Sequence, residues 1–220
     1  MTKSIVYIDS EMYEYYLPPK LTKKIRKFPT NISGISIENI INSMIGAKEC
    51  DNSDFLNANN RKLKIVGKLP SEYEEIPVVK REDGTLKSLD PQYEEYIRAV
   101  NETSNVIRSG IVEVIDFIRE KIFSNKEIRT QEISFTENHR VLALCDLSSD
   151  DAVLEIKTFD IFNSYKTENV IRQMYYQKCD KELYAMSIIF DFSYTKKMER
   201  RLDNLIFRIY KVEIKNVKEE

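Results

Sequence analysis

The chain has 220 residues, of which 42% are hydrophobic and 32% charged, and its formal net charge is −2. This length can bury a real core, and the composition excludes disordered and fibrous classes. The charge excludes a globally basic nucleic-acid binder, although an enzyme with a local basic groove remains compatible with it. Apolar runs such as 186–192 are much shorter than the roughly twenty residues of a membrane span, so no membrane partner is expected.

Cysteine usage and the amino terminus predict the compartment. Cys50, Cys145 and Cys179 lie far apart and are odd in number, which fits neither a disulfide framework nor a zinc-ligand spacing. A four-cysteine iron–sulfur cluster is excluded. The amino terminus has no long apolar segment of the kind found in signal peptides. We therefore expect an intracellular protein in a reducing compartment, cytoplasmic, or nuclear if the source is eukaryotic or viral.

Residues 1–100 mix short helical signals with turns, and we predict an N-terminal extension of helices and loops whose role is open. Helical spacing of apolar residues predicts one short helix, which Gly46 is suited to end: Ile37, Ile40, Ile41, Met44 and Ile45. The asparagine-rich stretch 52–60 is followed by 70–91, which has three prolines and many charges and is typical of a long loop or arm. A helix is expected to begin near Pro91.

Residues 101–220 are predicted to form an α/β core. A helix from about 106 to 123 is indicated by apolar residues on one face: Ile107, Ile111, Val114, Ile115, Ile118 and Ile122. Three strand-like segments follow, at 131–135, 141–147 and 152–159, and the sequence Ser-Ser-Asp-Asp at 148–151 predicts a turn between the last two.

The remainder of the core is predicted as a helix at about 167–179 and a buried strand at 183–192. Because a helical crossover joins strands that run in the same direction, the strands 152–159 and 183–192 should be parallel in a mixed sheet. Imperfect alternation at 204–217 predicts one extra strand at the C-terminal end.

Two acids and a lysine interrupt the apolar strands on either side of the predicted turn. Glu155 and Lys157 are two residues apart and so share a face of their strand. If Ser149-Asp150 forms the turn, Asp146 faces Val153 and projects from the same side, with its Cα roughly 7–8 Å from that of Glu155 as a diagonal neighbour. Two carboxylates at this spacing can converge on one hard divalent cation, which suggests Mg²⁺, with Mn²⁺ as a substitute.

A simpler interpretation stays open beside this one. An edge hairpin with a solvent-facing polar stripe and an ordinary Glu–Lys ion pair would show the same Glu-x-Lys tripeptide. The acid on the preceding strand, flanked by apolar residues and of the correct parity, favours the metal site, because an unpaired carboxylate in such a strand would be costly.

Together these features resemble the PD-(D/E)XK nuclease superfamily, in particular its RecB-type and lambda-exonuclease-like branches. The predicted order of helix, three strands, helix and strand matches that restriction-endonuclease-like core, over about 106–192. Asp146 matches the motif acid, and Glu155-Ile156-Lys157 matches the Glu-x-Lys element. The sequence of 109–113 looks like the family's glycine-then-glutamate helix motif, and that of 172–176 looks like its glutamine helix motif.

The resemblance implies a metal-dependent nuclease that hydrolyses phosphodiester bonds, more in keeping with DNA than with RNA. It implies a metal site of Asp146, Glu155 and the carbonyl of Ile156, with Glu113 as a third acid, for which Glu102 and Glu120 compete. Lys157 and Gln173 would orient the nucleophile or the substrate backbone. Cys145 replaces the usual proline, and Gln177 stands where the glutamine motif usually has a tyrosine, although Tyr176 precedes it.

Candidate nucleic-acid contacts lie outside the acids. If the nuclease interpretation holds, Arg172 and the basic turn with Lys196 and Lys197 are candidates for phosphate contacts, and Tyr176 is a candidate for a base or backbone contact. A solvated loop is the simpler interpretation of the basic turn.

Two other functions remain as alternatives. The first is an RNA endonuclease of the cap-snatching type, for which the only histidine, His139, is in the wrong place. The second is a non-catalytic nucleic-acid-binding or assembly subunit on the same fold. The oligomeric state is open, with a homo-oligomer among the options.

Overall fold

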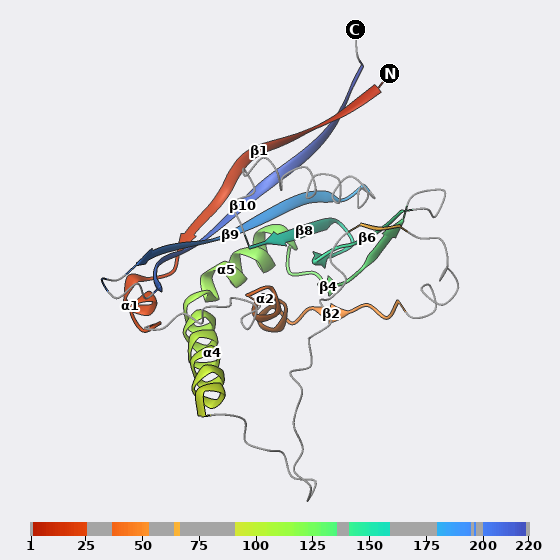
Figure 1. The fold of residues 1–220 in the computed structure, drawn as a ribbon. Helices are drawn as coiled ribbons and strands as arrows, with labels where there is room; N and C mark the ends of the chain where they lie inside the picture. Colours follow the sequence, from red (N-terminus) through yellow and green to blue (C-terminus); the bar gives the residue numbers. More distant parts are fainter. Residues whose placement is uncertain are drawn as a thin grey trace, which may run out of the picture.

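The structure is a computed structural model, which describes residues 2–25, 37–52, 64–66, 91–135, 141–158, 180–194, 196 and 200–218. Within these residues the chain is an α/β protein with a seven-stranded mixed open sheet, a three-stranded sheet and four α-helices (Figure 1). No helix among them is long and apolar enough to cross a membrane.

The large sheet is built mainly from the second half of the sequence. Its strands, in spatial order, are β1 (Thr2–Tyr16), β10 (Arg200–Lys218), β9 (Glu182–Tyr194), β8 (Ala152–Lys157), β7 (Leu147–Ser148), β4 (Arg129–Thr130) and β2 (Lys48–Glu49). The three-stranded sheet has the order β3 (Lys64–Val66), β6 (Val141–Leu144) and β5 (Ile133–Phe135). As predicted, β8 and β9 are parallel, and a long C-terminal strand follows β9.

The helices are α1 (Pro19–Thr22), α2 (Ile37–Ile45), α4 (Pro91–Gly110) and α5 (Val112–Phe117), the last continued by a π-helical turn, η2 (Ile118–Ile122). The sequence predictions for α2, for Gly46 as its end (φ +71°) and for a helix beginning at Pro91 are confirmed. The predicted helix 106–123 is interrupted at Ile111, whose φ of −105° and ψ of 14° separate α4 from α5. The apolar stripe continues across this break, because Ile107, Ile111, Ile115 and Ile118 are all buried.

The N-terminal region is more closely integrated than the predicted extension of helices and loops. β1 pairs antiparallel with β10 from Thr2↔Lys218 to Tyr16↔Ile206, so residues 2–16 belong to the same sheet as the C-terminal strand, and the two ends of the chain lie side by side (Figure 1). Two irregularities, between Ile8 and Ser10 and between Glu11 and Tyr13, interrupt its alternation. A period of two is the main sequence signal of a strand, so these bulges explain why the strand is hard to predict.

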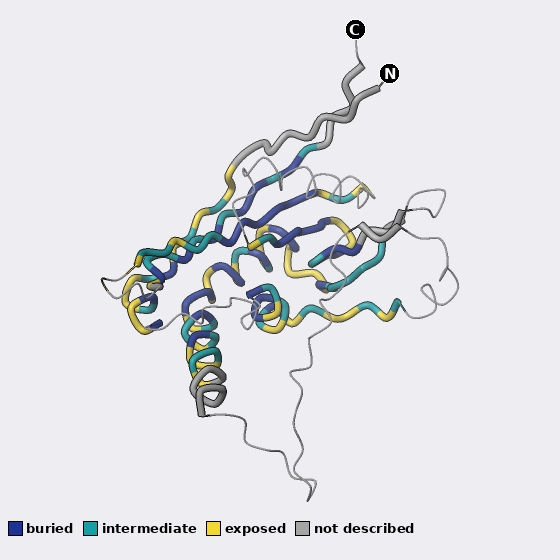
Figure 2. Tube along the Cα trace, viewed as in Figure 1, coloured by how far each residue is buried: buried dark blue, intermediate teal, exposed yellow. Residues whose placement is uncertain are grey.

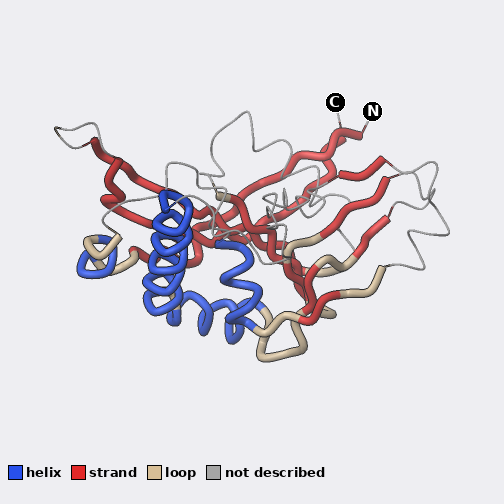
Figure 3. The backbone as a smooth tube through the Cα atoms, turned by 60° about the horizontal axis from the view of Figure 1, so that its bottom comes forward, coloured by secondary structure: helices blue, strands red, loops and turns tan. Residues whose placement is uncertain are grey.

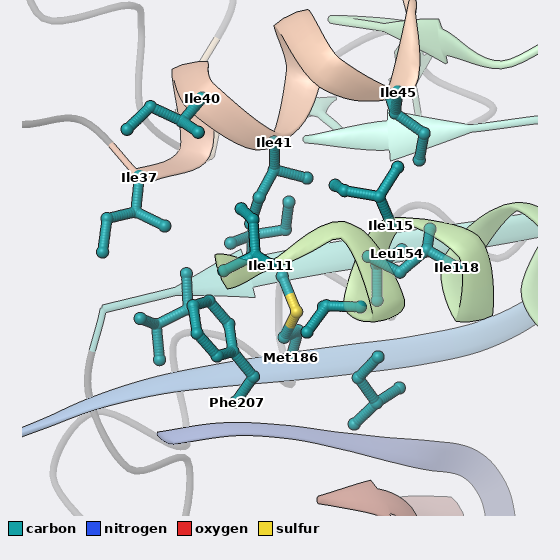
Figure 4. Packing of buried hydrophobic residues seen from close by; sticks show 14 of the residues in the cluster. Ile37, Ile40, Ile41, Ile45, Ile111, Ile115, Ile118, Leu154, Met186 and Phe207 are labelled. Atoms are coloured by element: carbon teal, nitrogen blue, oxygen red, sulfur yellow. The ribbon is translucent and has the colours of Figure 1, made fainter. Parts of the chain in front are cut away.

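The main core fills the space between the helices and one face of the large sheet. Buried residues of α2, of α5 with its N-cap, and of η2 meet alternate residues of β8, β9 and β10 (Figure 4): Ile37, Ile41, Ile111, Ile115, Ile118, Leu154, Met186 and Phe207. Buried chain is concentrated along these strands and helices (Figure 2), and the helices lie together on one side of the strands (Figure 3). The predicted helix at 167–179 lies outside the described residues.

Candidate metal centre on the β7–β8 hairpin

The pairing register of the hairpin between β7 and β8 is shifted by two residues from the predicted one, with a two-residue turn in both. Ser149 N–H donates to the Ala152 carbonyl at 2.8 Å, so the turn residues are Asp150 and Asp151. Leu147 pairs with Leu154, and Ser148 pairs with Val153. Continuing this register places Asp146 opposite Glu155, instead of diagonal to it. Because the shift is an even number of residues, the predicted sharing of one face is retained.

Both turn aspartates form ion pairs with basic residues, one within β4 and one shortly before it. Arg129 Nη2 lies 2.8 Å from Asp150 Oδ1, and Lys126 forms an ion pair with Asp151. The Ser149 hydroxyl accepts from the Asp151 and Ala152 amides, which closes the turn. The acidic residues of the turn are therefore structural, and the acids of interest are Asp146 and Glu155.

The predicted strand 141–147 is divided at Cys145 and Asp146. Before the division, β6 belongs to the three-stranded sheet, and after it, β7 belongs to the large sheet. Asp146 lies in this bend and in neither strand. A residue outside the regular strand pairing can direct its side chain along the sheet. Here the Asp146 carboxylate accepts a hydrogen bond from the Ile156 amide of β8.

Asp146, Glu155 and Lys157 converge on one point. Lys157 Nζ lies 3.0 Å from Asp146 Oδ2 and 2.8 Å from Glu155 Oε2. The Ile156 amide donates to the same Asp146 oxygen at 2.7 Å. The Glu155 side chain is 0% exposed, and those of Asp146 and Lys157 are 13% and 17% exposed. This degree of burial is not that of a solvent-facing stripe.

The electrostatics follow from two carboxylates that share one ammonium group. Burial and the charge of Asp146 raise the pKa of Glu155 to about 8, although Lys157 acts to lower it. Burial acts to lower the pKa of Lys157, but the charges of Glu155 and Asp146 outweigh it, and the pKa rises above its usual range. Lys157 is therefore held charged. Glu155 holds a proton near neutral pH unless a second cation binds beside it and neutralises its charge.

The donor set suits a hard cation. The Ala152 carbonyl and the Ile156 amide both point toward β7. In a strand the N–H and C=O of one residue point the same way, so the Ile156 carbonyl is also directed to the Asp146 side. Two carboxylate groups and a carbonyl are oxygen ligands of the kind Mg²⁺ uses, completed by water. Among the described residues, no group of three or more His, Cys, Asp or Glu is placed to hold a metal.

Glu113 lies away from the other acids. It is exposed in the first turn of α5, and its charge acts on Tyr13 and Tyr15 of β1, whose pKa values are raised first by burial and then by Glu113. The Tyr13 ring stacks on Phe117 of α5 with 4.1 Å between ring centroids, so this group is on the helix-covered side of the sheet.

Glu155 is on the opposite side. Its neighbours Leu154 and Ile156 belong to the helix-covered core, and adjacent residues of a strand point to opposite faces. The sheet therefore separates Glu113 from Asp146 and Glu155, and the structure does not bring the expected third acid to the site. The competing residues Glu102 and Glu120 are exposed on α4 and η2.

The glycine of the expected helix motif has a packing explanation. A Cβ at Gly110 would lie 2.2 Å from Leu17 Cδ1 and 2.8 Å from Leu21 Cδ1, and the Gly110 carbonyl accepts from the Tyr15 hydroxyl at 2.6 Å. Gly110 thus allows the end of α4 to approach the segment after β1.

The other predicted contacts are only partly described. Lys196 is exposed. Arg172, Gln173, Tyr176, Lys197 and His139 lie outside the described residues. Sequence reasoning missed Thr130, whose hydroxyl donates to the Asp146 carbonyl at 2.8 Å. The position of Thr130 beside Asp146 depends on strand pairing, and no local sequence pattern predicts it.

Comparison with known proteins adds no relative: no family model, no curated protein and no solved structure matches this chain.

Proposed function

We propose that this protein is a Mg²⁺-dependent nuclease of the PD-(D/E)XK type, with a restriction-endonuclease-like core, that hydrolyses phosphodiester bonds. The observation that carries the proposal is the convergence of Asp146, Glu155 and Lys157 at 2.8–3.0 Å in a buried hairpin. The set joins side chains of β8 to an acid in the bend before β7, which a chance Glu-x-Lys tripeptide on one strand lacks. DNA is the expected polymer, on the strength of the resemblance alone.

The strand order gives further support. From β7 through β8 to β9 the strands run antiparallel and then parallel, which matches the order of the family core. The motif acid sits at a bend before the hairpin, and the Glu-x-Lys residues are on the next strand.

In the proposed site, Asp146, Glu155 and the Ile156 carbonyl would hold the metal ion. Bound Mg²⁺ would lower the pKa of a coordinated water and stabilise the charge that develops on the phosphate. Glu155 has to lose its proton to act as a ligand, so binding should strengthen as the pH approaches 8.

Lys157 has the charge and position to act on the phosphate or the nucleophile. The two carboxylates raise the pKa of its ammonium group and keep it protonated, and the Lys157 side chain is 17% exposed. In a site with little water, a fixed positive charge stabilises developing negative charge strongly. Gln173 would assist by positioning water or the nucleic-acid backbone, as the resemblance implies.

The direct test is cleavage of labelled single- and double-stranded DNA and RNA with Mg²⁺, Mn²⁺ or EDTA. The proposal predicts metal-dependent cutting that is abolished by Asp146→Ala and by Lys157→Ala and retained by Asp150→Asn, which alters an exposed acid of the same hairpin. Cutting confined to RNA would favour the cap-snatching type of enzyme. Absence of cutting by the wild type under all conditions would argue against catalysis.

One observation favours a second function, that of a non-catalytic nucleic-acid-binding or assembly subunit. The described residues bring two acids together instead of three, because Glu113 lies across the sheet. A nucleic acid that binds with equal affinity with Mg²⁺ and with EDTA, and is not cut, would support this function.

A further inference from the structure

Two segments of the chain change sheets together at a paired kink: residues 129–135 pass from β4 to β5, and residues 141–148 pass from β6 through Asp146 to β7. Arg129 pairs with Ser148 in the large sheet, and Ile133 pairs with Leu144 in the three-stranded sheet. The sum of residue numbers is the same in both pairs, so the register before and after the kink is unchanged. An extra residue in one segment must therefore be matched by an extra residue in the other. These two residues are Gln131, between β4 and β5, and Asp146, between β6 and β7.

Gln131 forms a bulge of a type that usually contains glycine. Its φ is +58°, its N–H donates to the Cys145 carbonyl at 3.1 Å, and the Cys145 N–H donates to the Glu132 carbonyl at 3.2 Å. This pattern is that of a bulge whose first residue is left-handed. For a residue with a Cβ this conformation is unfavourable, so surrounding contacts have to maintain it.

Two side chains supply these contacts. Asn52 Nδ2 donates to the Gln131 carbonyl at 2.8 Å, from the segment that follows β2. The Thr130 hydroxyl donates to the Asp146 carbonyl at 2.8 Å. The Cys50 amide also donates to the Thr130 carbonyl at 3.1 Å, which ties the β2 segment to this point.

We infer that Thr130 is a positioning residue for Asp146, and that Asn52 supports it by holding the Gln131 bulge. Because Asp146 lies outside the regular ladder, the Thr130 hydroxyl is the side-chain contact that fixes its backbone on the β4 side. That backbone position directs the carboxylate to the Ile156 amide and toward Glu155. The inference about metal affinity rests on the proposed function, whereas the inference about position does not.

The first test measures position without a metal. Hydrogen exchange of the Ile156 amide, which donates to Asp146 Oδ2, is compared between wild type, Thr130→Val and Thr130→Ser. Thr130→Val should exchange about fivefold faster at Ile156, the effect of one weakened hydrogen bond. Thr130→Ser should retain the wild-type rate, and the Leu154 amide should be unaffected in both.

The second test is Mn²⁺ binding by calorimetry with the same variants. Thr130→Val should weaken Mn²⁺ binding by about 10–100-fold, as loss of a contact behind a metal ligand does. Thr103→Val is the control, because it makes the same change at a buried threonine in α4. Asn52→Ala, which leaves both strands of the kink intact, should act in the same direction if Thr130→Val does not fold.

The outcomes separate the two claims. Unchanged Ile156 exchange and unchanged Mn²⁺ affinity in Thr130→Val and Asn52→Ala would overturn the positioning role. Wild type that binds no Mn²⁺ would overturn the proposed metal site, while the exchange measurement still decides the position of Asp146.

Discussion

The two faces of β8 show opposite uses of neighbouring residues. Ala152, Leu154 and Ile156 point into the helix-covered core, whereas Glu155 and Lys157 point to the other side. Glu155 is as fully buried as the apolar set and the Lys157 side chain is 17% exposed, yet both of these side chains carry ionisable groups. Buried charge is costly even when it is paired, so the second face is a feature that stability alone does not explain. This contrast separates the residues that hold the fold from those proposed to act.

The largest expected effect on stability is on the apolar face. Leu154→Ala should lower the free energy of unfolding by about 2–5 kcal/mol, because Leu154 is fully buried between the sheet and the helices and its removal leaves a cavity. Urea denaturation measures this loss. A loss below about 1 kcal/mol would mean that the helices do not pack on β8 as described.

Lys157→Met should reduce activity strongly and stability less than Leu154→Ala does. Cleavage should fall by about 10²–10³-fold, because a fixed positive charge near the phosphate is lost. At pH 6 Glu155 can hold its proton, so the stability loss should be smaller than that of Leu154→Ala. Equal loss of stability in the two variants would contradict the division between the faces.

The pH dependence of stability sharpens the contrast further. The pKa of Glu155 is raised from 4.5 to about 8, so between these values the folded state holds a proton that the unfolded state has released. The stability of wild type should therefore fall relative to Glu155→Gln as the pH rises through this window, by at most about 1.4 kcal/mol per pH unit.

Glu182→Gln serves as the control for that experiment. The Tyr184 hydroxyl and Lys211 lower the pKa of Glu182, so its contribution to stability is lost as the pH falls. The two variants should thus differ from wild type with opposite pH trends. A flat difference for Glu155→Gln would show that Glu155 is not held protonated.

A smaller effect is expected where the helices meet the segment after β1. Gly110→Ala should cost about 1–3 kcal/mol, because the added methyl group would overlap Leu17. Ser109→Ala, at an exposed neighbouring position, is the control. If Gly110→Ala left stability unchanged but impaired cleavage, the glycine would belong to the site and not to the packing.

The sequence predicted the elements whose pattern is regular and local. The apolar stripe of α2, the parallel pairing of β8 with β9 and the shared face of Asp146 and Glu155 all follow from periodicity and turn position. The observed hairpin register differs from the predicted one by two residues. Asp146 and Glu155 still share a face, because only an odd shift moves a side chain to the other face.

The rest could not be predicted because it depends on tertiary contacts. The bulges of β1 hide its alternation, and the break at Ile111 leaves the helical stripe intact. The glycine and glutamate of 109–113 satisfied a short motif, but Glu113 is placed by α5 on the far face of the sheet. The kink at Gln131 and the hydrogen bond from the Thr130 hydroxyl to the Asp146 carbonyl both depend on residues that are distant in sequence.

The proposed metal centre can be tested by calorimetric titration of the wild type with Mn²⁺ at pH 8, beside Asp146→Asn and Asp150→Asn. Asp150 is an exposed acid of the same hairpin, paired with Arg129. If Asp146 and Glu155 hold the metal, Mn²⁺ should bind to the wild type and to Asp150→Asn, and Asp146→Asn should abolish binding. Equal binding by all three proteins, or no binding by the wild type, would contradict the assignment of Asp146 and Glu155 as a metal centre.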